Sequence, residues 1–155
     1  MELKSPIEVI ALICTPMLRV HTGLWLLPSE IVGHELDEAV RLRIEAIDIR
    51  QSLLDSLPQG AHYTGLTEPK LLGLIDAIAQ LSGRKDCALV YNVDLLLSRI
   101  SYFERRRFWQ DFFIGLPHRT QGVLIAVPET ADEVLPPSDD LLDWSQAHRL
   151  AGTTN

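Results

Sequence analysis

Basic residues are scarce in this sequence, and long hydrophobic runs are missing. Only 14 of the 155 residues are Lys or Arg, against 21 Asp or Glu, which gives a net charge of −7. Proteins that coat nucleic acid or anionic membranes by charge alone rely on many basic side chains, so the composition argues against that class. No apolar run approaches the roughly 20 residues that a bilayer-spanning helix needs. We therefore expect no membrane insertion.

Cysteine is also scarce, and its spacing indicates no metal or redox motif. Cys14 and Cys87 are far apart in the sequence, each lies in an apolar context, and no Cys-x-x-Cys occurs. We expect buried free thiols in a reducing cytoplasm. The five histidines lack the His-x-x-x-His spacing of a zinc site, so no metal is expected. Glu2 and Glu8 interrupt the apolar N-terminal stretch, which we therefore do not expect to be a targeting segment.

Apolar runs alternate with helix-like segments along the chain. We expect strands at residues 21–28, 61–66, 87–93 and 121–128 and helices at 5–17, 35–57, 67–81, 101–117 and 138–149. The strands are apolar throughout, as strands buried on both faces are. This order predicts one α/β domain with a three-layer, mostly parallel sheet of about four to five strands and helices on both faces. Residues 1–20 form an N-terminal helix, 21–130 the sheet core, and 131–155 a C-terminal helix and tail.

The longest of these predicted helices spans residues 35–57. Its apolar residues recur at helical spacing, with charged residues on the other side. Pro58-Gln59-Gly60 ends it. The apolar positions that define the predicted buried face are Leu36, Val40, Ile44, Ile47 and Leu54.

Ligand sites in open parallel sheets lie at the carboxyl ends of the strands. The clearest strand, ALVYNVD (residues 88–94), ends in Asn92 and Asp94. Together with GLWLLP before it and GVLIAVPET after it, this strand resembles the core of a P-loop NTPase of the AAA-like branch. GLWLLP resembles the first strand of that family, ALVYNVD its Walker B strand and GVLIAVPET its sensor strand. The resemblance implies a P-loop-NTPase-like fold, with Asp94 where that family binds magnesium.

A second similarity concerns the segment that follows. A helix with Phe108-Trp109 and Phe112-Phe113, then Leu-Pro-x-Arg ending at Arg119 and a strand, is similar to small ATPase-like components of bacterial phage-defence operons of the BREX type. This resemblance implies a protein partner within a multi-subunit complex.

The phosphate-binding loop of that family is missing. A working P-loop has Gly-x-x-x-x-Gly-Lys-Ser/Thr after the first strand, because its backbone N–H groups and its lysine hold the phosphates. The segment LLPSEIVGHELDEAV keeps only Gly33, and Pro28 has no N–H. Leu95 replaces the catalytic carboxylate that usually follows Asp94. We predict no nucleotide cofactor and no catalytic residue, with Asn92 and Asp94 as remnants that cap a strand end or bond internally. The acidic residues that would repel a triphosphate are Glu30, Glu35, Asp37 and Glu38.

The segment from Arg84 to Arg119 has the opposite charge to the rest of the chain. It holds seven basic and four acidic residues, a local charge of 7 − 4 = +3. Its basic residues form either a solvated helix face or a docking patch for an acidic protein or a nucleic-acid backbone. The acidic C-terminal stretch has the complementary charge, so a homo-oligomer is a further candidate. The candidate partner-binding residues are Arg105, Arg106, Arg107, Trp109 and Arg119.

Two classes of function remain. The first is a non-hydrolysing, ATPase-like interaction subunit, in an anti-phage complex if the resemblance holds. The alternative is an active enzyme, either a nucleotide hydrolase completed by a partner or a metal-dependent nuclease. The nuclease hypothesis comes from Glu68-Pro69-Lys70, a Glu-x-Lys pair with Asp55 as metal partner. However, such a pair must lie on a strand, whereas Thr67-Glu68-Pro69 is typical of a helix start.

Overall fold

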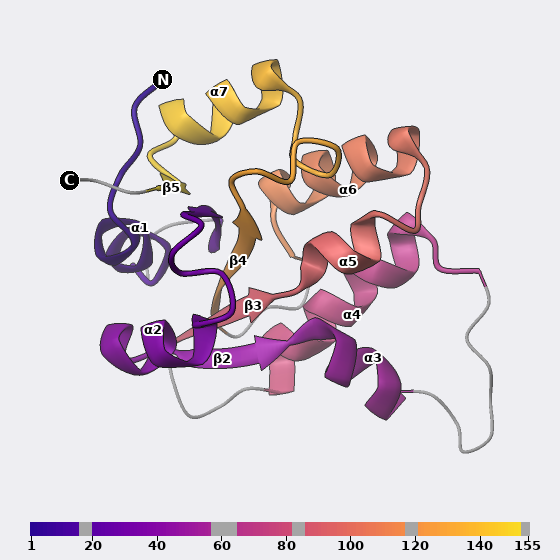
Figure 1. The fold of residues 1–155 in the computed structure, drawn as a ribbon, viewed down its shortest axis with the longest axis horizontal. Helices are drawn as coiled ribbons and strands as arrows, with labels where there is room; N and C mark the ends of the chain where they lie inside the picture. The colour runs from indigo at the N-terminus through magenta and orange to yellow at the C-terminus, as the bar shows by residue number, and fades with distance from the viewer. Residues whose placement is uncertain (16–19, 57–64, 82–85, 117–120, 153–155) are drawn as a thin grey trace.

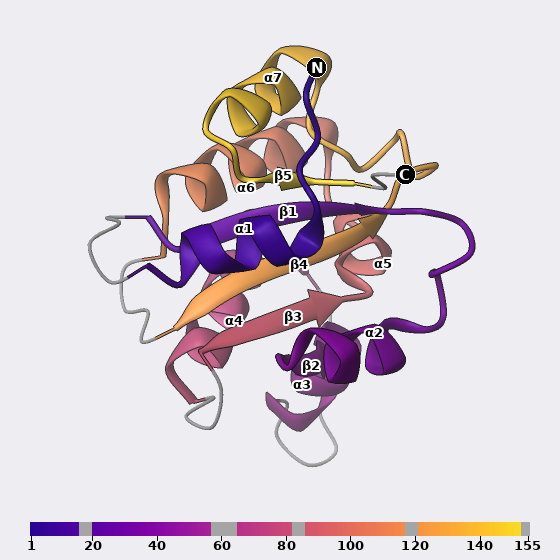
Figure 2. The ribbon, with the colours of Figure 1, turned by 90° about the vertical axis from the view of Figure 1, so that its left-hand side faces the viewer.

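A computed structural model describes residues 1–15, 20–56, 65–81, 86–116 and 121–152. The helices are α1 (Pro6–Ile13), α2 (Glu35–Leu42), α3 (Ile49–Ser56), α4 (Glu68–Leu81), α5 (Val93–Leu97), α6 (Tyr102–Ile114) and α7 (Ser138–Gln146). The strands are β1 (Thr22–Leu27), β2 (Glu45–Asp48), β3 (Cys87–Tyr91), β4 (Gly122–Pro128) and β5 (Leu150–Ala151). They form one all-parallel sheet with the order β2-β3-β4-β1-β5 (Figure 1; all five strands are labelled in Figure 2). The predicted α/β fold is confirmed.

Helices cover both faces of the sheet, so the molecule has three layers. Figure 2 shows α1 in front of β1 and β4, with α4, α5 and α6 behind them. Successive strand residues point to opposite faces, so Leu24 of β1 belongs to the core that includes α4 and α6, while Trp25 belongs to the core that includes α1. Both cores are apolar, which explains why the central strands β1, β3 and β4 do not alternate between apolar and polar residues.

Local signals predict several of these elements correctly. The Ser5 hydroxyl caps α1 by accepting a hydrogen bond from the Glu8 N–H at 3.2 Å. The helix α4 begins at Glu68, as predicted, and its Leu71, Ile75 and Ile78 are buried. Most of the strand predicted at residues 61–66 lies outside the described residues. Among the helices that the structure describes, none is long and apolar enough to cross a membrane.

The single long helix predicted at residues 35–57 is wrong. The segment instead forms α2, β2 and α3, and β2 pairs in parallel with β3 at the edge of the sheet. Arg43 takes a left-handed conformation with φ of 59°, which ends α2. Of the predicted apolar face, Ile44 is buried, but Leu36 and Val40 are exposed.

Two short elements were not predicted. The chain after β3 turns at once into α5, and β5 adds a second edge strand beside β1. Asn92 makes the first of these turns with a φ of 65°. His148, with a φ of 60°, is left-handed just before β5. Glycine usually marks a left-handed position in a sequence, but Asn92 and His148 occupy these two positions. The turns before α5 and β5 were therefore not predicted.

Candidate functional site

The parallel strands bring their carboxyl ends to one edge of the sheet. The segments that meet there are residues 28–34 after β1, Asp48 at the end of β2, residues 92–94 after β3 and residues 128–130 after β4. The carboxyl end of the predicted strand 61–66 lies outside the described residues. β4 lies between β1 and β3, so the three strands that carry the P-loop resemblance are adjacent. A nucleotide bound as the resemblance implies would lie at this edge.

The loop between β1 and α2 uses its own amide hydrogens. The N–H groups of Ile31 and Val32 donate to the Pro28 carbonyl at 2.9 and 3.3 Å, and the His34 N–H donates to the Ile31 carbonyl at 2.8 Å. The Gly33 N–H donates to Glu35 Oε1 at 3.2 Å. Four consecutive amides are thus bonded within the segment. A phosphate cradle needs such N–H groups to point at the ligand.

Carboxyl groups dominate the charge at this edge. Glu35 is 7% exposed and lies at the start of α2. Burial, followed by the charge of Glu35, raises the pKa of Asp94. Burial also raises the pKa of Tyr91, with further contributions from Asp48 and Glu35. Glu35 contributes to both shifts, and Arg50 opposes them. A buried carboxylate beside the end of β3 disfavours an anionic ligand there.

Asn92 and Asp94 both take part in the turn into α5. The Asp94 carboxylate is half-buried and accepts hydrogen bonds from its own N–H and from that of Leu95. The Asn92 side chain bonds to Asp48 at the end of β2. Burial alone would raise the pKa of Asp48, but the hydrogen bonds from Arg50 and Asn92 outweigh it and lower that pKa.

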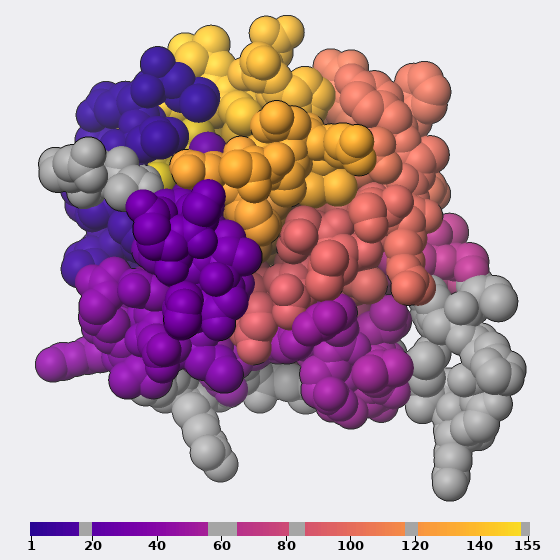
Figure 3. Space-filling model, viewed as in Figure 1, coloured from indigo at the N-terminus to yellow at the C-terminus, as the bar shows by residue number. Residues whose placement is uncertain are grey.

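A hollow of about 460 Å³ lies beside Asp94, between the segments that follow β3 and β4. Figure 3 shows these two segments, salmon and orange, in contact on one face of the molecule. Asp132 and Glu133 line the hollow together with Asp94. Within the described parts of the chain, however, no group of three or more His, Cys, Asp or Glu side chains is arranged to hold a metal ion.

The three consecutive arginines of α6 do not form one patch. Successive helix residues point about 100° apart, so the three side chains leave the helix in different directions. Arg105 Nη1 donates to the Ile100 carbonyl at 2.6 Å. Arg106 Nε lies 3.7 Å from Asp140 Oδ2 on α7. Arg107 lines a groove between α4 and α6.

The other two candidate partner-binding residues are not found on the described surface. Trp109 is 1% exposed, and its Nε1–H donates to the Val134 carbonyl at 2.7 Å. It is a core residue, because the apolar stripe of α6 includes Phe108, Trp109 and Phe112. Arg119 lies outside the described residues. The exposed aromatic residues of α6 are instead Tyr102 and Phe103.

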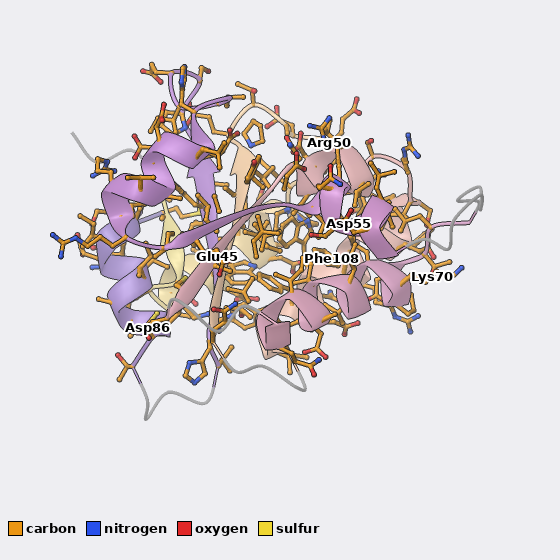
Figure 4. The ribbon with its side chains drawn as sticks, turned by 90° about the horizontal axis from the view of Figure 1, so that it is seen from below. Glu45, Arg50, Asp55, Lys70, Asp86 and Phe108 are labelled. Carbon is orange, nitrogen blue, oxygen red and sulfur yellow. The ribbon has the colours of Figure 1, made fainter. Side chains whose placement is uncertain are left out.

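The residues of the nuclease hypothesis have separate partners. Glu68 opens the helix α4 and does not lie on a strand. Lys70 Nζ donates to the Gly65 carbonyl at 3.1 Å, and Asp55 Oδ1 accepts from Gln51 at 2.9 Å. Figure 4 shows Asp55 and Lys70 on different helices. The structure thus gives no strand that would present a Glu-x-Lys pair to a metal.

Sequence reasoning missed one pair of carboxyl groups. Glu68 and Asp111 share a side-chain hydrogen bond across the groove between α4 and α6, a hollow of about 560 Å³. The two residues are 43 positions apart, so only the packing of α4 against α6 reveals the pair.

No protein-family model matches the chain, and no curated protein matches its sequence.

Proposed function

We propose that this chain is a non-hydrolysing, ATPase-like α/β domain that acts as a protein-interaction subunit. One observation carries the first half of the proposal: the amides of residues 31–34 are all bonded within the β1–α2 segment. A triphosphate would have to break these bonds and approach the buried Glu35 carboxylate. The adjacency of β1, β4 and β3 supports the ATPase-like ancestry.

Thermal unfolding with and without Mg-ATP tests this half. We expect the same unfolding midpoint in both conditions and the same result for Asp94→Ala. A site filled at a ligand concentration 100 times its Kd would add about 2.7 kcal/mol to the free energy of unfolding. Such a gain in the wild type, lost in Asp94→Ala, would favour the nucleotide hydrolase instead. The same measurement on the assembled complex tests a hydrolase that a partner completes.

The outer face of α6 is the surface that we propose for partner binding. We define it by Phe103, Arg106, Arg107, Gln110 and Ile114, which follow helical spacing and are all exposed. Phe103 is 82% exposed and Ile114 72%. Large apolar side chains that flank two arginines fit a protein surface with acidic side chains between two apolar patches.

The occupant that we propose is another subunit of a cytoplasmic, multi-protein complex, of the anti-phage kind that the similarity of α6 implies. A second copy of this chain fits less well, because Arg106 already faces Asp140 of its own chain. Nucleic acid also fits less well, because Arg105 bonds to a backbone carbonyl and Arg107 lies beside acidic residues. These two occupants are the alternative outcomes of the test.

Co-expression with the products of the neighbouring genes tests the surface. We expect a complex that survives size-exclusion chromatography and that the double variant Phe103→Ser, Ile114→Ser abolishes. The matched control is Leu36→Ser, Val40→Ser, which removes two exposed apolar residues from α2. If both double variants lose the complex equally, or if neither loses it, the result contradicts the proposed surface. If self-association or DNA capture depends on Phe103, the occupant of this surface is a second copy of the chain or DNA instead of another subunit.

A further inference from the structure

The fold brings the two cysteines together at the amino end of the sheet. Cys14 follows α1, and Cys87 is the first residue of β3. The Cys14 thiol donates to the Asp86 carbonyl, with 3.5 Å between sulfur and oxygen. Asp86 is the residue directly before Cys87. The Cys14 sulfur therefore lies beside the backbone that carries Cys87.

Gly122 supplies a second, independent contact. It is the register neighbour of Cys87 on β4. A Cβ at Gly122 would lie 3.3 Å from the Cys14 sulfur, so the glycine leaves the space that this thiol occupies. Cys14 is thus held against residues that flank Cys87 along the chain and across the sheet.

The two thiols lie in the same small region but differ in chemistry. Cys14 is partly exposed, and Cys87 is buried. The hydrogen bond between them lowers the pKa of Cys14, whereas that bond and burial raise the pKa of Cys87. The thiolate is the form that attacks an oxidant, so Cys14 is the reactive partner and Cys87 stays a thiol beside it.

The pair is remote from the edge that holds Asn92 and Asp94. Figure 4 shows Asp86, the neighbour of Cys87, at the opposite end of the molecule from Arg50, which follows β2. Chemistry at the cysteines is therefore separate from the candidate functional site.

We propose that Cys14 and Cys87 are an oxidation site that hydrogen peroxide converts into an intramolecular disulfide. The Cys14 thiolate attacks one peroxide oxygen and displaces hydroxide, which gives a sulfenic acid. The Cys87 sulfur then attacks the Cys14 sulfur, the S–O bond breaks, and water leaves with the thiol proton. Two thiols and one peroxide thus give one disulfide and two waters, and the peroxide accepts both electrons. The new bond ties the end of α1 to the start of β3.

Thiol counting on the full chain tests this inference. The protein is treated with hydrogen peroxide, quenched with catalase, and labelled with N-ethylmaleimide in denaturant. We expect two labels on the reduced protein, none on the oxidised protein, and two again after dithiothreitol. Peptide mapping should find Cys14 linked to Cys87 within one chain. The closed loop is long, so the Tm of the oxidised protein should rise.

Single variants separate the roles of the two thiols. In Cys87→Ser, we expect dimedone to trap a sulfenic acid at Cys14. In Cys14→Ser, Cys87 should keep its label after the same treatment, because it is buried. Overoxidation of wild-type Cys14 while Cys87 stays labelled would overturn the inference. Disulfides between chains, or an oxidised form with a lower Tm, would overturn it as well.

Discussion

The fold changes the protonation of Glu68. It is 3% exposed, and its Oε1 has no hydrogen-bond partner among the described residues. Two carboxyl groups can share a hydrogen bond only when one of them is protonated. Burial, the bond to Asp111 and its charge raise the pKa of Glu68 to about 7, and Glu104 adds to this while Arg107 opposes it.

The variant Glu68→Gln should remove a pH-dependent part of the stability. Folded Glu68 keeps its proton up to about pH 7, whereas the unfolded chain releases it near the ordinary pKa of 4.5. The folded state therefore binds more protons between these values, and its free energy of unfolding falls as the pH rises through them. The amide of Gln can donate to Asp111 at any pH. We expect Glu68→Gln to be clearly more stable than the wild type at about pH 8 and similar at about pH 5.

Urea unfolding at both pH values measures this difference. The groups that face Glu68 across the groove are Asp111, Glu104 and Arg107 from α6, and Asp76 lines the same groove from α4. The variant minus wild-type difference measures Glu68 together with the groups that interact with it, of which Asp111 acts most strongly. Glu30→Gln, which changes an exposed carboxylate, is the matched control. An equal difference at both pH values would contradict the shared proton.

At the scale of elements, the structure follows the sequence where the signal is local. β1, β3 and β4 are almost entirely apolar, and α4 and α6 have both a start signal and a buried stripe. These features need no knowledge of the rest of the chain. The sequence therefore predicts the layers and the parallel sheet.

The segment 35–57 shows why other elements could not be predicted. It contains no glycine or proline, and its apolar spacing fits a helix. The helix ends because Arg43 turns left-handed, and the Ile44 N–H then bonds to the Ala39 carbonyl at 3.0 Å. Ile44 enters the core, and β2 gains its hydrogen bonds from β3, more than 40 residues away. Tertiary pairing thus overrides the helical pattern.

Some features of the candidate site can likewise be predicted from the sequence, whereas others depend on the fold. The sequence alone shows that the segment after β1 lacks the lysine and one of the two glycines of a P-loop. The bond from the Gly33 N–H to Glu35 and the bond between Asn92 and Asp48 depend on backbone geometry and on strand order. Burial of Trp109 likewise depends on α7, whose Trp144 packs on the same aromatic cluster through Phe112.

Arg43→Gly should stabilise the protein. A non-glycine residue in the left-handed conformation destabilises the folded state by roughly 1–2 kcal/mol. Glycine avoids this strain, but its larger entropy in the unfolded state offsets about 0.5–1 kcal/mol of the gain. We expect a net gain of about 0.5–1 kcal/mol in the free energy of unfolding. Arg43→Ala keeps the strained φ and should give no gain. Equal stability of both variants in urea would show that the turn carries no strain.

At the scale of the whole molecule, Arg149 joins three parts that are distant in sequence. It is buried beside β5, where burial lowers its pKa to about 10, so it remains charged at neutral pH. Its guanidinium donates to the Thr22 carbonyl at 2.8 Å, the Thr22 hydroxyl at 3.0 Å and the Phe113 carbonyl at 2.7 Å. The guanidinium carbon lies 4.4 Å from the Phe113 ring centroid and 4.7 Å from that of Trp144. One side chain thus ties β1, α6 and α7 together.

Arg149→Met should therefore weaken the whole fold. The apolar side chain fills the space and avoids the desolvation of a charge, but it leaves three acceptors without this donor and loses two cation–π contacts. Each charged hydrogen bond contributes about 1.5–3 kcal/mol, and the desolvation cost of the cation offsets part of the sum. We expect a loss of about 3 kcal/mol in the free energy of unfolding, measured by urea denaturation. Arg99→Met replaces an exposed arginine and should change stability by less than about 0.5 kcal/mol. If both variants unfold at the wild-type midpoint, the contacts of Arg149 do not hold the C-terminal helix and β5 to the sheet.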